Sequence, residues 1–175
     1  MSCSQILSGI AKDCLVNKGG IKRVILANRD DVTAVTVTDG QVSAITMASS
    51  KKFLEFGFRA NTSNFASTWQ INAENGTKYV QTLLTMIFGR MDTAKRVAIM
   101  ALAQADLIGI VEDANGLFWL LGYDDPLMLA DGSDAQTGTA RADRNGYTVV
   151  LEDNSDELPY EVDPDIVDAL IQVVA

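Results

Sequence analysis

The chain has 175 residues, of which 47% are hydrophobic and 21% are charged, with 13 glycines and 3 prolines. This length and composition are typical of one globular domain and exclude a collagen-like or disordered chain. Histidine is absent and the two cysteines are Cys3 and Cys14, so Ser-His and Cys-His catalytic pairs and a closed zinc site are excluded.

The net charge of -9 is distributed unevenly along the chain. Residues 1–111 carry 12 Lys and Arg against 8 Asp and Glu, a net +4, whereas residues 112–175 carry 2 arginines against 15 acids, a net -13. An acidic surface repels phosphate, so we expect no sequence-independent binding to nucleic acid. Surfaces of opposite sign could instead bring two copies together, and the alternative is a solvated acidic surface that aids solubility.

Strand patterns fill the first half of the chain. Five runs rich in β-branched and aromatic residues predict strands, at 21–28, 32–38, 41–47, 52–60 and 64–73. The Asp39-Gly40 pair between the second and third runs is typical of a tight hairpin turn. The last two runs are predicted to pair antiparallel with each other.

The middle of the chain, residues 77–104, is predicted to be helical. After Asn75-Gly76, apolar residues follow the three- and four-residue spacing of one helix face, at Val80, Leu83, Leu84, Ile87 and Phe88. Gly89 ends this predicted helix. Asp92 is then predicted to cap a second helix over 92–104, a segment full of strong helix formers.

Strand signals return after residue 106. Two hairpins are predicted, one around Asn115-Gly116 and one around Arg144-Asn145-Gly146. Residues 164–173 form either a short helix on their own core or an extended arm. The prediction is therefore an α+β chain with mainly antiparallel β-structure, a sandwich or barrel over 1–152 with a flanking central helix, and an acidic extension or arm over 153–175.

Candidate chemical sites are few. The acids from Asp124 to Asp134 could bind a divalent cation in a small enzyme or ligand-binding domain, but they lack the spacing of a calcium loop. Four acids near the end of the predicted sandwich are expected in a solvated loop, namely Glu152, Asp153, Asp156 and Glu157. No glycine-rich phosphate loop is present, and apolar runs are shorter than the roughly 18 residues of a spanning helix. We expect no catalytic residue, cofactor, metal or membrane anchoring, and an assembly role is favoured.

The order of several motifs resembles virion proteins of tailed phages. The motifs are Cys3 and Cys14 ahead of GGIKRVILAN, then NAENGTKYVQTLLTMIF, VEDANGLFWLLGY and TGTARADRNGYTVVLED. They are similar to tail-tube and neck-ring proteins, especially of phages that infect Bacteroidetes, over about residues 3–152. The resemblance implies a tail-tube-like β-sandwich, related to type VI secretion tube proteins, whose strands join those of neighbouring copies into a barrel. The acidic segment 153–168 and the ending DIVDALIQVVA depart from that pattern.

The resemblance also implies a function and a set of partners. The expected role is a structural virion protein in the tail or neck, assembled in the host bacterial cytoplasm into stacked, head-to-tail hexameric rings. Expected partners are other copies, other tail or neck proteins, and DNA that passes through the lumen without sequence-specific binding. Contacts between rings or subunits are expected at Ser49, Ser50, Lys51, Lys52, Asn61, Thr62 and Asn64, and at Tyr160, Ile166 and Leu170. The alternatives are an ordinary loop and a C-terminal helix folded on its own core.

Overall fold

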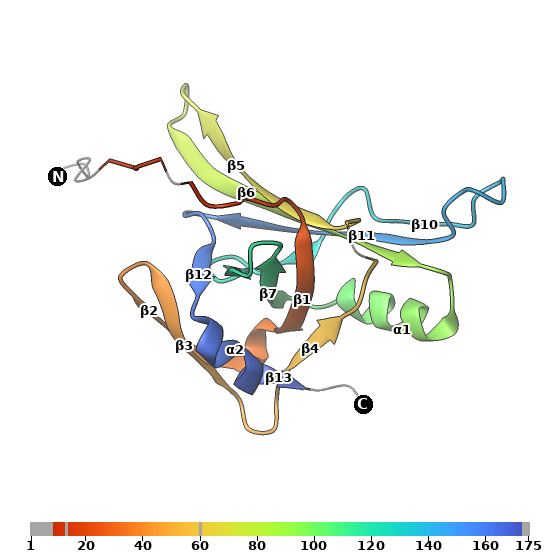
Figure 1. The fold of residues 1–175 in the computed structure, drawn as a ribbon, viewed down its shortest axis with the longest axis horizontal. Coiled ribbons are helices and arrows are strands. Elements are labelled where there is room, and N and C mark those ends of the chain that lie inside the picture. The colour runs from red at the N-terminus through yellow and green to blue at the C-terminus, as the bar shows by residue number, and fades with distance from the viewer. Residues whose placement is uncertain (1–8, 13, 60, 173–175) are drawn as a thin grey trace.

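Two β-sheets that share a hydrophobic core form most of the molecule (Figure 1). The computed structural model describes residues 9–12, 14–59 and 61–172. In spatial order, the larger sheet contains β13 (Ile171–Gln172), β4 (Phe53–Phe56), β1 (Ile21–Asn28), β7 (Leu107–Asp113), β8 (Phe118–Leu121), β12 (Tyr160–Val162), β3 (Gln41–Met47) and β2 (Val32–Thr38). The smaller sheet contains β10 (Asp134–Gln136), β11 (Gly146–Ser155), β6 (Thr77–Gly89) and β5 (Asn64–Asn72), and β9 (Met128–Leu129) also pairs with β11.

Two helices and one helical turn complete the fold of the described residues. A 3-10 turn (Arg29–Asp31) follows β1, α1 (Thr93–Leu102) follows β6, and α2 (Pro164–Leu170) precedes β13. In the part of the chain that the structure describes, all strand pairs are antiparallel except β12 with β3 and β13 with β4. The predicted α+β class, with antiparallel-rich curled sheets and a helix, is therefore confirmed.

The core lies on both faces of the larger sheet. Alternate residues of β1 show this, because Val24 and Leu26 contact the core between the sheets, whereas Ile25 and Ala27 face a second core. The second core is covered by α2, which buries Val167 there. A strand covered on both faces is apolar at consecutive positions, which explains the run VILA in β1.

The helix predicted from residue 77 is wrong, and within 77–104 the chain is helical only over Thr93–Leu102. Residues 77–89 form β6, in which every second side chain from Val80 to Phe88 is buried. Leu83 and Ile87 lie on the opposite, half-buried face, so apolar residues on both faces imitate helical spacing. The second predicted helix is confirmed. The Asp92 side chain accepts a hydrogen bond from the Lys95 backbone N–H at 2.8 Å, which caps α1.

Two strand pairings differ from the prediction. β4 pairs with β1 in the larger sheet, whereas β5 pairs with β6 in the smaller one, so the chain crosses between sheets after Phe56. The turn expected at Arg144-Asn145-Gly146 also does not form. Gly146 is already the first residue of β11, and the loop between β10 and β11 spans residues 137–145. Hereafter we call these nine residues the 137–145 loop.

The boundary predicted at residue 153 is not a boundary in the structure. β11 continues to Ser155, and β12 lies inside the larger sheet between β8 and β3. Pro164–Leu170 then folds as a helix on its own core, one of the two alternatives, and β13 pairs with β4. The many acidic residues of this segment suggest a solvated extension. Its apolar residues Val162, Val167 and Leu170 nevertheless pack in the second core, and its strands β12 and β13 belong to the larger sheet.

Candidate interaction surfaces

The predicted contact residues Ser49–Lys52 form a turn between β3 and β4 that is fixed to its own chain. The Lys51 ammonium lies 3.3 Å from the Asp31 carboxylate, and the Lys52 ammonium donates a hydrogen bond to the Ala169 carbonyl in α2. Ser49 and Ser50 remain exposed. The turn borders a groove of about 370 Å³ beside α1.

The other predicted contact residues lie in different places. Asn61 and Thr62 are in the crossing between the sheets, where the Thr62 hydroxyl donates to the Arg59 carbonyl at 2.6 Å, and Asn64 begins β5. Tyr160 is half-buried in β12, whereas Ile166 and Leu170 pack into the second core of their own chain. Within this set, Lys52 contacts the C-terminal helix through the Ala169 carbonyl, and Ile166 and Leu170 share the second core.

The acids from Asp124 to Asp134 are not gathered into one site. Asp124 accepts a hydrogen bond from the Asp156 backbone N–H at 3.1 Å, whereas Asp134 pairs with Arg144 at 3.0 Å in the smaller sheet. Across the residues that the structure describes, no three acidic or cysteine side chains are grouped so that they could hold a metal ion.

The edge strand β5 is a feature that the sequence analysis missed. Among the described residues, the nine residues NFASTWQIN pair with β6 alone, and they contain no charge and no proline. The pairing runs in unbroken register from Asn64–Thr85 to Asn72–Thr77. β2 is a second uncharged edge, although its pairing with β3 contains two register shifts. The lack of charge is visible in the sequence, but the position of β5 at an edge is not.

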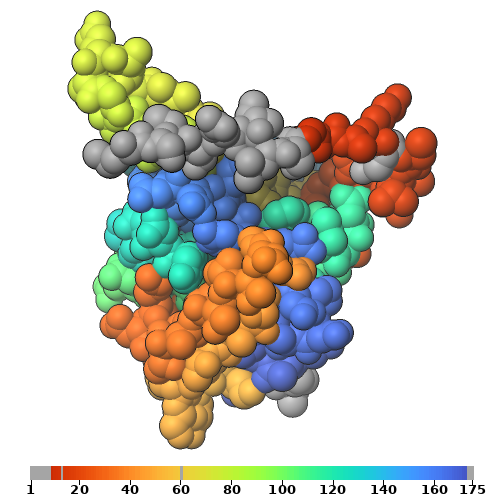
Figure 2. Space-filling model, turned by 90° about the vertical axis from the view of Figure 1, so that its left-hand side faces the viewer, coloured from red at the N-terminus to blue at the C-terminus, as the bar shows by residue number. Residues whose placement is uncertain are grey.

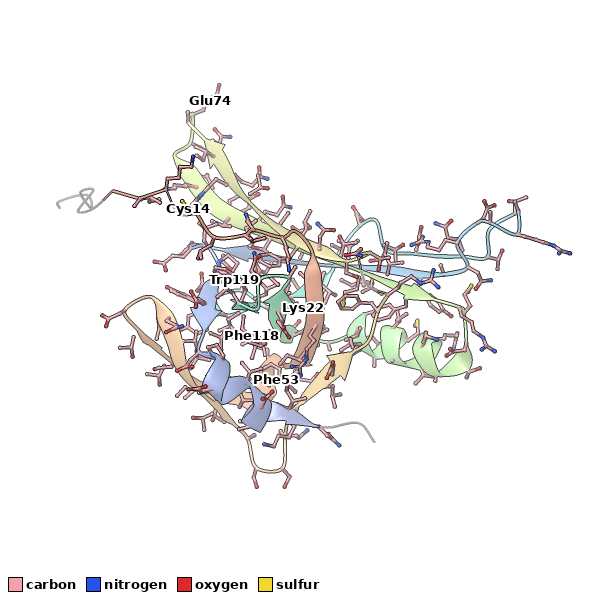
Figure 3. All side chains as sticks on the ribbon, viewed as in Figure 1. Cys14, Lys22, Phe53, Glu74, Phe118 and Trp119 are labelled. Atoms are coloured by element: carbon pink, nitrogen blue, oxygen red, sulfur yellow. The ribbon has the colours of Figure 1, made fainter. Side chains whose placement is uncertain are left out.

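The far end of the hairpin of β5 and β6 projects from the molecular body, whereas Leu84, Met86 and Phe88 of β6 pack in the shared core. Figure 2 shows it as a projection in yellow, and Figure 3 places Glu74 at its tip, pointing outward. Trp69 and Ile71 remain 41% and 68% exposed there, and the Lys78 ammonium lies 4.4 Å from the Trp69 ring centre. Apolar side chains that are exposed on a projecting hairpin are typical of an interaction surface.

A pocket of about 230 Å³ lies where β8, β11 and β12 meet. Hereafter we call it the acidic pocket, because its lining includes Asp124, Asp153, Asp156 and Glu157 and no basic residue. Tyr123 and Tyr160 form an edge-to-face ring pair at 5.9 Å beside these acids. The Tyr160 hydroxyl donates to the Glu157 carboxylate, and this bond raises the pKa of Tyr160.

Asp153 is the buried member of the acidic pocket, and its predicted place in a solvated loop is wrong. Its side chain is 2% exposed and accepts hydrogen bonds from the Gly122 N–H at 2.8 Å and the Ser155 hydroxyl at 3.3 Å. Burial is the main cause of its raised pKa, and the hydrogen bonds oppose the shift. The physical reason for the correction is that β11 extends through Ser155 and carries Asp153 inward.

Neither helix of the described residues has the length and apolar character needed to span a bilayer. Comparison with protein-family models, with curated proteins and with solved structures gave no match. The features of the described residues that bear on function are the edge strand β5, the projecting hairpin and the charged surfaces.

Proposed function

We propose that this chain is a structural virion protein of a tailed phage that assembles into rings of the tail tube or neck. In such a particle the rings are hexameric and stacked head to tail, and DNA passes through their lumen. The observation that carries the proposal is the long, regular and uncharged edge strand β5. The motif resemblance described above supports the phage setting.

Proteins protect the edges of their sheets against pairing with other chains. An edge strand offers unpaired N–H and C=O groups, and monomeric proteins usually block them with charges, proline, bulges or a short strand. β5 has none of these features, whereas the edges at β10 and β13 are only three and two residues long. The first residues of this edge, Asn64 and Phe65, line a pocket together with Lys18 and Gly20, and the edge from Ala66 onward is suited to pairing with a strand of a neighbouring copy, which would extend the sheet around a ring.

The projecting hairpin supports the same role. Trp69 and Ile71 belong to β5 and are exposed, so a neighbour that paired with this edge would also cover apolar surface. The net charge of -9 gives a surface on which DNA finds little counter-charge, as passage through a lumen requires.

The test places two lysines on the β5 edge. The variant Ala66→Lys with Thr68→Lys adds charge at two exposed positions of β5, and the matched control Ala44→Lys with Thr46→Lys adds the same charge at two exposed positions of the interior strand β3. Sedimentation velocity and negative-stain imaging at high protein concentration are the measurements. Rings or tubes are expected from the parent chain and the β3 control but not from the β5 variant. Assembly that tolerates both lysines on β5, or a parent chain that stays monomeric, would contradict the proposal.

A further inference from the structure

Residues of opposite charge lie near the two ends of β11. The strand has ten residues and spans about 30 Å at a rise of about 3.3 Å per residue. The 137–145 loop lies at its first residue, and the acidic pocket lies at its last residues. Figure 1 shows the loop projecting beyond β10 on one side of the molecule and β12 on the other.

The loop end presents three exposed arginines. Arg141 lies in the 137–145 loop, while Arg90 and Arg96 follow β6, which ends opposite Gly146. Within residues 9–12, 14–59 and 61–172, none of the three guanidinium groups forms an ion pair or a side-chain hydrogen bond. By contrast, Arg144 at the base of the loop is paired with Asp134. The three exposed guanidinium groups can therefore pair with acids of another molecule, and Arg90 also lies close enough to Asp92 to contribute to the lowered pKa of that carboxyl.

Hydrogen bonds within the 137–145 loop fix the backbone on both sides of Arg141. The Asp143 carboxylate accepts hydrogen bonds from the backbone N–H groups of Thr139 at 2.8 Å and Ala140 at 2.6 Å, and the Asp143 N–H donates to the Ala140 carbonyl at 3.0 Å. These bonds close a turn over residues 140–143 with Arg141 at its second position. The backbone around Arg141 is therefore fixed before binding, so less backbone freedom is lost when this residue binds a partner.

The pocket end has the chemistry that recognises a guanidinium. Asp124, Asp156 and Glu157 are exposed at the acidic pocket, and none of them has a salt-bridge partner among the described residues. Carboxylates bind a guanidinium through paired hydrogen bonds, and tyrosine rings such as Tyr123 and Tyr160 stack against its plane. The exposed Leu158 adds an apolar wall for the arginine methylenes.

From this charge complementarity we infer that the acidic pocket of one copy binds Arg141 in the 137–145 loop of a second copy. Arg90 and Arg96 belong to the same positive end and strengthen its attraction to the acids. The two surfaces are different parts of one chain, so the contact is heterologous and joins copies head to tail. The inference rests on the proposed function and adds to it the residues that join one ring to the next.

The test uses two variants that each lose one half of the contact. Arg141→Glu inactivates the loop and keeps the pocket, whereas Glu157→Arg inactivates the pocket and keeps the loop. Both are made in the chain that also carries lysines at Ala66 and Thr68, so that pairing at the β5 edge does not contribute. Sedimentation velocity is measured for each variant alone and for their equimolar mixture. The control replaces Arg141→Glu with Arg59→Glu, which changes the same charge at an exposed arginine outside the loop.

A 1:1 dimer is expected only when the two variants are mixed. Each variant alone should associate with itself at least about tenfold more weakly than the two variants associate with each other. Circular dichroism confirms that both variants are folded before mixing. Arg59→Glu alone should form chains of more than two copies, because both of its surfaces are intact. A mixture that stays monomeric, or an Arg141→Glu variant that associates with itself like the control, would overturn the inference. If the β5 lysines do not affect ring assembly while mixing still gives dimers, the edge proposal fails and the head-to-tail contact stands.

Discussion

Gly146 provides a sharp test of how β6 and β11 approach each other. It begins β11 directly opposite Gly89, the last residue of β6. A Cβ atom added at Gly146 would lie 2.0 Å from the carbonyl oxygen of Phe88 and 3.2 Å from the Cα of Gly89. These are backbone atoms of a paired strand, so they cannot rotate away as a side chain could. The glycine is required here by lack of space, and its backbone is not left-handed.

The expected cost of Gly146→Ala follows from this geometry. The strands must separate by more than 1 Å at this end, which adds an overpacking cost of about 1–3 kcal/mol. One or two backbone hydrogen bonds near the chain reversal would weaken, at about 0.5–1.5 kcal/mol each. Alanine also lowers the entropy of the unfolded chain, which offsets about 0.4–1 kcal/mol. The free energy of unfolding should therefore fall by about 2–4 kcal/mol.

Gly89→Ala is the matched control, because a Cβ at Gly89 would meet no atom within 4 Å. Urea unfolding followed by the fluorescence of Trp69 and Trp119 measures both variants, with an unchanged slope indicating an unchanged unfolding transition. We expect a clear loss of stability for Gly146→Ala and a change within about 0.5–1 kcal/mol for Gly89→Ala. Equal unfolding midpoints for the two variants would show that the close approach of β11 to β6 is incorrect.

Two further predictions concern carboxylates with defined partners. Because burial raises the pKa of Asp153, its folded form binds a proton more tightly than the unfolded form, so its contribution to stability should increase as pH falls from neutral toward the ordinary value of 3.8. Asp153→Asn should reduce this rise in the urea midpoint, and an identical pH dependence in both proteins would refute the assignment. Asp92→Ala removes the cap of α1 and should lower the urea midpoint of unfolding, whereas Asp92→Asn should retain most of the stability. Because its hydrogen bonds to Lys95 lower the pKa of Asp92, the stabilisation from this cap should be complete above pH 3.8 and decrease as pH falls below it.

Features with a local cause were predictable from the sequence. The hairpin of β2 and β3 turns at Asp39-Gly40, where both residues have positive φ, 52° and 82°. β7 and β8 are joined through Asn115-Gly116, and Gly116 has a φ of 89°. In both cases the turn residues tolerate the required backbone angles, so the signal is contained in two adjacent positions.

Features that depend on distant packing were not predictable in the same way. Asn145-Gly146 has the same two residue types as Asn115-Gly116, yet Gly146 is needed for close contact with β6 rather than for a turn. Likewise, Leu83 and Ile87 suggested a helix because β6 is at least half-buried on both faces, a property that only the neighbouring strands determine. Similar local patterns therefore serve different roles according to what lies opposite them.

The candidate interaction surfaces also depend on packing that the sequence does not show. The absence of charge in NFASTWQIN can be read directly, but its consequence depends on β5 lying at the end of the strand order β10-β11-β6-β5. Had the same residues formed an interior strand, both sides would be paired and no edge would be available. Charge counting is limited in a related way. Arg141 lies within the acidic third of the sequence, and β11 separates it from the acidic pocket by the length of the strand. β11 therefore places Arg141 and the acidic pocket at opposite ends of the molecule, although they are close in sequence. The two can then meet only between different copies.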